Sequence, residues 1–72
     1  MPNLTFESIL NHQWSQVQGR KGRIYVVVKW EGYDEPTWET MEVIKKDDPL
    51  TLAKYAKDQY LLETPHWKWA KH

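Results

Sequence analysis

The 72-residue sequence contains no cysteine and carries no net charge, because ten Lys and Arg residues balance ten Asp and Glu residues. Without cysteine the chain has no disulfide framework, no thiolate nucleophile and no thiolate zinc site, which is compatible with a reducing compartment. Without net charge, general attraction to nucleic acid or anionic lipid has no support. Any binding of that kind therefore has to come from a local patch of charge.

Long apolar runs are also absent, since no segment approaches the roughly 20 residues needed to span a bilayer. The start Met1-Pro2-Asn3 lacks the charged and apolar regions of a signal peptide. We therefore expect a soluble, intracellular protein with no membrane partner. The three histidines show no metal-ligand spacing, so we expect neither a metal nor another cofactor. Phosphate loops, nucleophile elbows and paired metal-ligand motifs are missing as well, and the sequence predicts no enzyme.

Aromatic residues are what this short chain has in excess, with five Trp, four Tyr and one Phe. A chain of this length permits one compact domain, and aromatics compensate for its small core by burying a large area each. Those outside the core are candidates for a ligand surface, because Trp and Tyr make rigid, amphipathic contacts. We expect one domain over residues 1–72, with its core within residues 4–62 and a basic aromatic tail at residues 63–72.

Residues 24–31 give the clearest strand signal, because apolar residues recur there at every second position. The two faces of this strand carry Ile24, Val26, Val28 and Trp30 on one side, and Tyr25, Val27, Lys29 and Glu31 on the other. We expect the first face in the core and the second half solvated. Shorter strands and turns are predicted around it: strands at residues 4–10 and 37–39, turns at residues 18–23 and 32–36, and residues 41–44 as a candidate extension of the sheet.

The last third of the chain changes to a helical period. Asp47 or Asp48 suits an N-cap, and Pro49 suits the first helical position, where its missing N–H costs nothing. The spacing predicts a helix from about residue 49 to about residue 61, which Thr64-Pro65 should end. The predicted class is therefore α+β: a small, curved, three-stranded antiparallel sheet, or partly open barrel, with a C-terminal helix packed across it.

The run Val-Lys-Trp-Glu-Gly-Tyr at residues 28–33, followed by Thr-Trp-Glu at residues 37–39, resembles the chromodomain family. The stretch Phe-Glu-Ser-Ile-Leu-Asn at residues 6–11 resembles the family's first strand. This resemblance implies a nuclear module that holds an extended histone-type peptide and closes an aromatic cage on a methylated lysine. A methylammonium is attracted to the negative face of each aromatic ring by about 0.5–2 kcal/mol.

Carried over position by position, the resemblance places cage residues at Trp30 and Tyr33, with Glu35 near an acidic position that borders the cage. The family's first cage aromatic falls on Leu4, which has no ring. The cage is therefore expected to be incomplete unless Phe6 replaces the missing ring. The other positions implied to contact the peptide are Thr5, Glu7, Glu39 and Val43.

Trp38 and Trp14 differ in their relation to the family. The resemblance implies that Trp38 is a buried structural residue, whose loss would unfold the domain. Trp14 has no counterpart in the family. It either covers the open edge of the barrel or makes an exposed contact, and the sequence leaves both roles open.

A second resemblance links residues 46–57 and 61–68 to polyproteins of copia-type retrotransposons, in which a chromo-like module accompanies integrase and reverse transcriptase. It implies that the chain is one piece of a longer protein and directs a retroelement to chromatin. Two other functions stay open. Arg20, Lys21 and Arg23 lie in one turn and are candidate contacts for DNA or RNA. A shadow-type module would instead dimerise through its helix and edge strand, so both a monomer and a weak homodimer are open.

Overall fold

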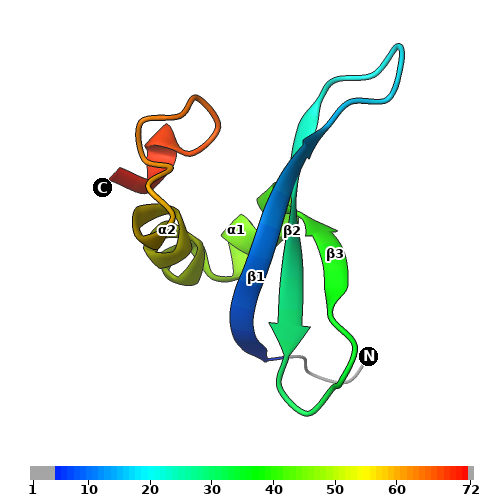
Figure 1. The fold of residues 1–72 in the computed structure, drawn as a ribbon, viewed down its shortest axis with the longest axis vertical. Coiled ribbons are helices and arrows are strands. Elements are labelled where there is room, and N and C mark those ends of the chain that lie inside the picture. Colours follow the sequence, from blue (N-terminus) through cyan, green and yellow to red (C-terminus); the bar gives the residue numbers. More distant parts are fainter. Residues whose placement is uncertain (1–4, 72) are drawn as a thin grey trace. The chain divides into compact units, whose positions relative to one another are not determined.

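The computed structural model describes residues 5–71, which form three strands followed by helices (Figure 1). The elements are β1 (Phe6–Ser15), β2 (Arg23–Trp30), β3 (Thr37–Thr40), α1 (Met41–Asp47), α2 (Pro49–Asp58) and the 3₁₀-helix η1 (Lys68–Lys71). The chain divides between Met41 and Glu42 into two compact units, which we call the sheet unit and the helical unit. An open, three-stranded antiparallel sheet with helices confirms the predicted α+β class.

The sheet has the strand order β1-β2-β3, with both pairs antiparallel. β1 is longer than predicted and contains two irregularities, one between Phe6 and Ser8 and one between Ile9 and Asn11. Each extra residue bends a strand and increases its twist, so these bulges give the sheet its curvature. The loop of residues 16–22 lies at one end of the sheet and the turn of residues 31–36 at the other (Figure 1). We call these the loop end and the turn end.

β2 alternates as predicted between two environments. Its buried residues are Ile24, Val26, Val28 and Trp30, while Tyr25, Val27 and Lys29 between them are partly exposed. We call the corresponding sides of the sheet the buried face and the outer face. Partners in a ladder point to the same side of a sheet, so the pairing register assigns residues of β1 and β3 to these faces.

Trp38 lies on the outer face, and the prediction that it is buried is wrong. It pairs with Val27 of β2, whereas its neighbours Thr37 and Glu39 pair with Val28 and Val26. Because side chains alternate along a strand, this register turns the Trp38 indole away from the buried face. Trp38 is accordingly 52% exposed.

Residues 41–44 begin the helix α1 and do not extend the sheet. Met41 and Ile44 are both buried, and their spacing of three residues places them on one side of a helix. Glu42 lies in the first turn, and Lys45 and Lys46 lie in the last, an arrangement that complements the helix dipole. The four residues 41–44 are too short a segment for strand and helix periods to be told apart in the sequence.

α2 begins where the sequence predicts. The Asp48 side chain accepts a hydrogen bond from the Thr51 N–H at 3.1 Å, and Pro49 occupies the first turn. Hydrogen bonds from the Thr51 hydroxyl and then from its N–H lower the pKa of Asp48, because they stabilise the carboxylate. The cap therefore fixes the start of the helix.

α2 ends at Asp58, earlier than predicted, because Tyr60 adopts a left-handed conformation with φ of 60°. The Leu61 N–H donates to the Ala56 carbonyl at 2.8 Å, and the Tyr60 N–H donates to the Lys57 carbonyl at 3.2 Å. These two bonds form a Schellman motif, which normally has glycine at the left-handed position. Because a tyrosine occupies this position instead of glycine, the sequence does not indicate that the helix ends here.

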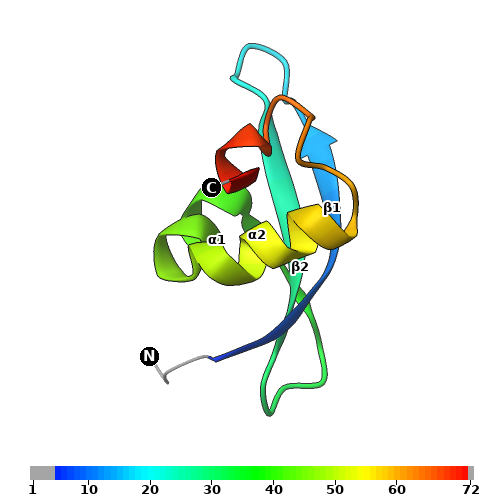
Figure 2. The ribbon, with the colours of Figure 1, turned by 90° about the vertical axis from the view of Figure 1, so that its left-hand side faces the viewer.

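The basic aromatic tail, for which the sequence gives no structure, completes the helical unit. Trp67 is 2% exposed, and its ring centroid lies 5.9 Å from that of Tyr55 in α2. The Lys45 Nζ atom of α1 lies 4.3 Å from the centroid of the Trp69 ring, a cation–π contact. After α2 the chain returns toward the helices and ends in η1 (Figure 2). In the described part of the chain, no helix combines the length and the apolar character of a membrane span.

Candidate functional site

Trp30 is the best-fixed aromatic residue at the turn end. It is 9% exposed, and its indole Nε1–H donates to the Thr37 hydroxyl oxygen at 2.7 Å. The Thr37 hydroxyl in turn donates to Glu39 Oε2 at 2.8 Å. Since a hydroxyl both accepts and donates, these two bonds link β2 to β3 and hold the indole in one orientation.

Phe6 lies beside Trp30, because the two residues are partners in the β1–β2 ladder. Their ring centroids are 5.1 Å apart, and the ring planes are tilted by 52°. This separation is typical of an attractive aromatic pair. The structure therefore brings Phe6 to Trp30, while Leu4, the position matched to the family's first cage aromatic, lies outside the described residues.

Tyr33 is presented next to Trp30 by a tight turn. The Tyr33 N–H donates to the Trp30 carbonyl at 3.2 Å, and Gly32 has a φ of 82°, as the third residue of a type II turn requires. The Lys29 ammonium reinforces the turn by donating to the carbonyls of Trp30, at 2.9 Å, and of Tyr33. The Tyr33 side chain is 46% exposed and thus available to a ligand.

Carboxylates surround this turn. Glu31, Asp34 and Glu35 are exposed within it, and Glu7 lies 3.6 Å from the Lys29 ammonium. Four carboxylates against one ammonium give the turn end a negative potential, which favours a cationic ligand.

The positions implied to contact a peptide fall in both units. Thr5 and Glu7 are exposed, and Glu39 is half-buried with its carboxylate bound to Thr37. The Thr5 carbonyl accepts a hydrogen bond from the Glu31 N–H at 2.8 Å, so this backbone group already has a partner. Val43 belongs to α1 in the helical unit, where it is exposed.

Trp14 packs over the start of β2. A Cβ atom built on Gly22 would lie 2.1 Å from the Trp14 indole, so the ring occupies the space above this glycine. Trp14 pairs with Ile24 and remains about half exposed. The ring therefore covers Gly22 at the loop end of the strand pair, while about half of the residue's surface is exposed.

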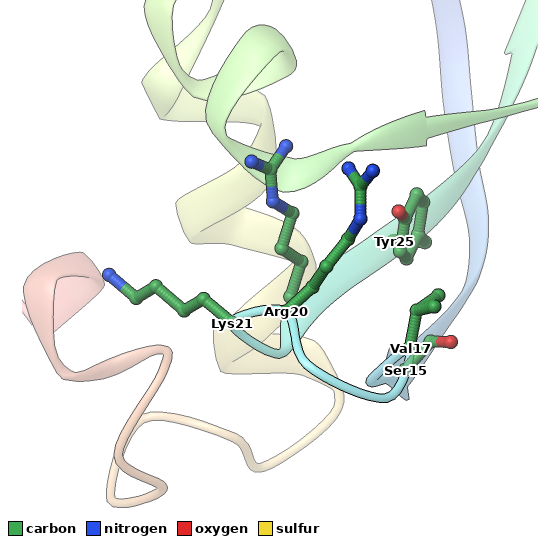
Figure 3. A pocket seen from close by; sticks show the side chains of 6 residues that line it. Ser15, Val17, Arg20, Lys21 and Tyr25 are labelled. Atoms are coloured by element: carbon green, nitrogen blue, oxygen red, sulfur yellow. The ribbon is translucent and has the colours of Figure 1, made fainter.

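The loop end holds a cationic hollow of about 600 Å³ (Figure 3). It is lined by Ser15, Val17, Arg20, Lys21, Arg23 and Tyr25. The Arg20 N–H donates to the Val17 carbonyl at 2.9 Å, which closes a turn through Gly19 with its φ of 78°. Lys21 extends away from Tyr25 in the close view (Figure 3). Arg20 and Lys21 belong to the loop of residues 16–22, and Arg23 is the first residue of β2. The three predicted nucleic-acid contacts therefore line one hollow at the loop end.

The sequence interpretation misses an aromatic pair on the outer face. Tyr25 and Trp38, with Gln13 and Ser15, line a second hollow of about 240 Å³. Because side chains alternate along a strand, Trp38 shares a face with Thr40 and not with Thr37. Which face that is depends on the β2–β3 register, which the sequence alone does not show. Over residues 5–71, no group of His, Cys, Asp and Glu side chains could hold a metal ion.

A comparison with protein families identifies the chain. The model of the Chromo (chromatin organisation modifier) domain matches residues 5–58, which include all three strands and both α-helices. Searches of curated proteins and of solved structures gave no match. Domains of this family are chromatin-associated binding modules and not enzymes. The match covers most of the sequence, and the chain belongs to the chromodomain family.

Proposed function

We propose that the chain binds an extended, histone-type peptide through a methylated lysine, with Trp30 and Tyr33 as two walls of an aromatic cage. The observation that carries this proposal is the hydrogen-bonded orientation of Trp30 beside the turn that presents Tyr33. A methylammonium makes few strong hydrogen bonds but is attracted to ring faces. The carboxylates of the turn end, Glu35 among them, favour the same cationic ligand.

Phe6 is the proposed third ring, because it contacts Trp30 at a centroid distance of 5.1 Å. Thr5, Glu7, Glu39 and Val43 are the proposed peptide contacts, by their match to the family. The module would act in the nucleus. The resemblance of residues 46–57 and 61–68 to retrotransposon polyproteins supports a role in directing such a polyprotein to chromatin.

Calorimetry with two histone-tail peptides, identical except for trimethylation of one lysine, tests the proposal. The methylated peptide should bind more tightly, and Tyr33→Ala should weaken its binding roughly 2- to 30-fold, the value of one cation–π contact. The unmodified peptide should be unaffected. Tyr60→Ala is the control, since Tyr60 is 92% exposed and lies beyond α2. Equal affinities for both peptides would rule the cage out.

Two substitutions locate the third wall. Phe6→Leu removes the ring beside Trp30 and should weaken binding of the methylated peptide only. Leu4→Tyr restores a ring at the family's position and should strengthen that binding. If Leu4→Tyr leaves the affinity for the methylated peptide unchanged, the match of Leu4 to the cage is mistaken.

A further inference from the structure

The outer face carries a second surface, unrelated to the proposed peptide site. Its two hollows, of about 600 Å³ and 240 Å³, share Ser15 and Tyr25 and therefore adjoin each other. The surface runs from Arg20 and Arg23 at the loop end to Trp38 on β3. Trp30, on the buried face at the turn end, contributes to neither hollow. We call this region the outer surface.

The outer surface is cationic. Neither hollow is lined by a carboxylate, and within residues 5–71 no ion pair involves Arg20, Lys21 or Arg23. The carboxylates of the sheet unit lie elsewhere: Glu7, Glu31, Asp34 and Glu35 at the turn end, and Glu39 opposite Val26 of the buried face. Guanidinium groups without internal partners favour an anion, and they bind phosphate with planar, bidentate geometry.

The outer surface is also aromatic. Val27 pairs with Trp38, and Tyr25, two residues before it on the same face, pairs with Thr40. Tyr25 and Trp38 are therefore diagonal neighbours, a relation that brings long aromatic side chains within reach of each other. Trp38 is half exposed and Tyr25 partly exposed. An acidic peptide would bind through the arginines alone. The two exposed rings beside the arginines favour a ligand with unpaired bases, because such bases stack on aromatic side chains.

We propose that the outer surface binds single-stranded nucleic acid, with phosphates on Arg20 and Arg23 and bases stacked on Tyr25 and Trp38. The chain as a whole is uncharged, so this binding depends on the local separation of charge between the loop end and the turn end. A duplex keeps its bases paired and stacked, and it offers the two rings nothing to stack on.

Fluorescence anisotropy with a labelled single-stranded oligonucleotide of mixed sequence, as DNA and as RNA, tests this inference over a range of salt concentrations. Two arginine–phosphate contacts predict a slope of log K against log salt of about −1.4, because each contact on a single strand contributes about −0.7. The double variant Arg20→Gln/Arg23→Gln should bring the slope toward zero. Lys54→Gln/Lys57→Gln, which removes two exposed charges from α2, should leave it unchanged.

Trp38→Ala separates stacking from charge. It should weaken binding about fivefold or more at each salt concentration without changing the slope, whereas Trp38→Phe should retain most of the affinity. A thermal melt of each variant checks that it is folded. Absence of binding at low salt, equal affinity for a duplex of the same sequence, or equal affinity for a glutamate-rich peptide with no loss in Trp38→Ala would overturn the inference.

Discussion

Trp30 and Trp38 lie on opposite faces of the sheet, and the two residues differ in exposure and in contacts. Trp30 is 9% exposed, donates a hydrogen bond to Thr37 and contacts Phe6. Trp38 is 52% exposed and borders a hollow beside Tyr25. Both belong to the motif by which the sequence resembles the family, yet the pairing register turns one indole toward the buried face and the other toward the outer face. A shared motif therefore predicts the positions of the strands better than it predicts which side chains are buried.

The two ends of the sheet carry side chains of opposite charge. The turn end has the carboxylates of Glu7, Glu31, Asp34 and Glu35, and the loop end has three exposed cations within four residues. An uncharged chain can thus present opposite potentials on separate surfaces. Substitutions on each face measure how much each side chain contributes to stability.

The largest expected difference is between Trp30→Ala and Trp38→Ala. Truncating a buried tryptophan costs about 3–5 kcal/mol, so Trp30→Ala should unfold or severely destabilise the chain. Trp38→Ala should cost less than about 1 kcal/mol, because much of its surface is already in water. Urea denaturation followed by circular dichroism measures both. Equal losses would contradict the assignment of the two faces.

Gly22→Ala should have an intermediate effect, because its Cβ atom would overlap the Trp14 indole. Displacing or overpacking the ring is expected to cost about 1–3 kcal/mol. In a Trp14→Ala background the same substitution should be neutral or slightly stabilising, since alanine restricts the unfolded chain and Gly22 is not among the glycines with positive φ. A double-mutant cycle by thermal or urea unfolding gives the coupling. Additive effects would show that Trp14 does not occupy this space.

Thr37→Val should have a smaller effect than Gly22→Ala. It removes the hydroxyl between the Trp30 indole and Glu39 with little change in volume, at a cost of about 1 kcal/mol. Thr5→Val, at an exposed position, should change the free energy of unfolding by less than about 0.5 kcal/mol. If the two variants unfold at the same urea concentration, the bridging hydroxyl contributes nothing to stability.

Patterns of neighbouring residues predicted the parts of the fold that depend on interactions between neighbouring residues. Alternation gave the buried face of β2, and Asp48 with Pro49 gave the start of α2. Three features had no such signal. The outward position of Trp38 depends on the β2–β3 register, the end of α2 on a left-handed Tyr60, and the burial of Trp67 on a contact with Tyr55.

Part of the candidate site was proposed from the sequence and stays a proposal. The resemblance to the family proposed Trp30 and Tyr33, and the structure adds the hydrogen bond that orients the Trp30 indole and the backbone bond that closes the turn at Tyr33. The contact of Phe6 with Trp30 could not be read from spacing, because the irregularity after Phe6 changes the register of β1. The placement of Tyr25 and Trp38 on one face depends on the β2–β3 register, which local sequence patterns do not show.

The most direct test is a nuclear magnetic resonance titration of the ¹⁵N-labelled chain with a trimethyl-lysine histone-tail peptide. The indole Nε1–H signals report on each tryptophan separately, and Trp→Phe variants assign them. The Trp30 indole and the Tyr33 amide should shift with the methylated peptide and much less with the unmodified one, while the Trp38 indole stays in place. Shifts at Trp38 with an unchanged Trp30 signal would contradict the proposed peptide site.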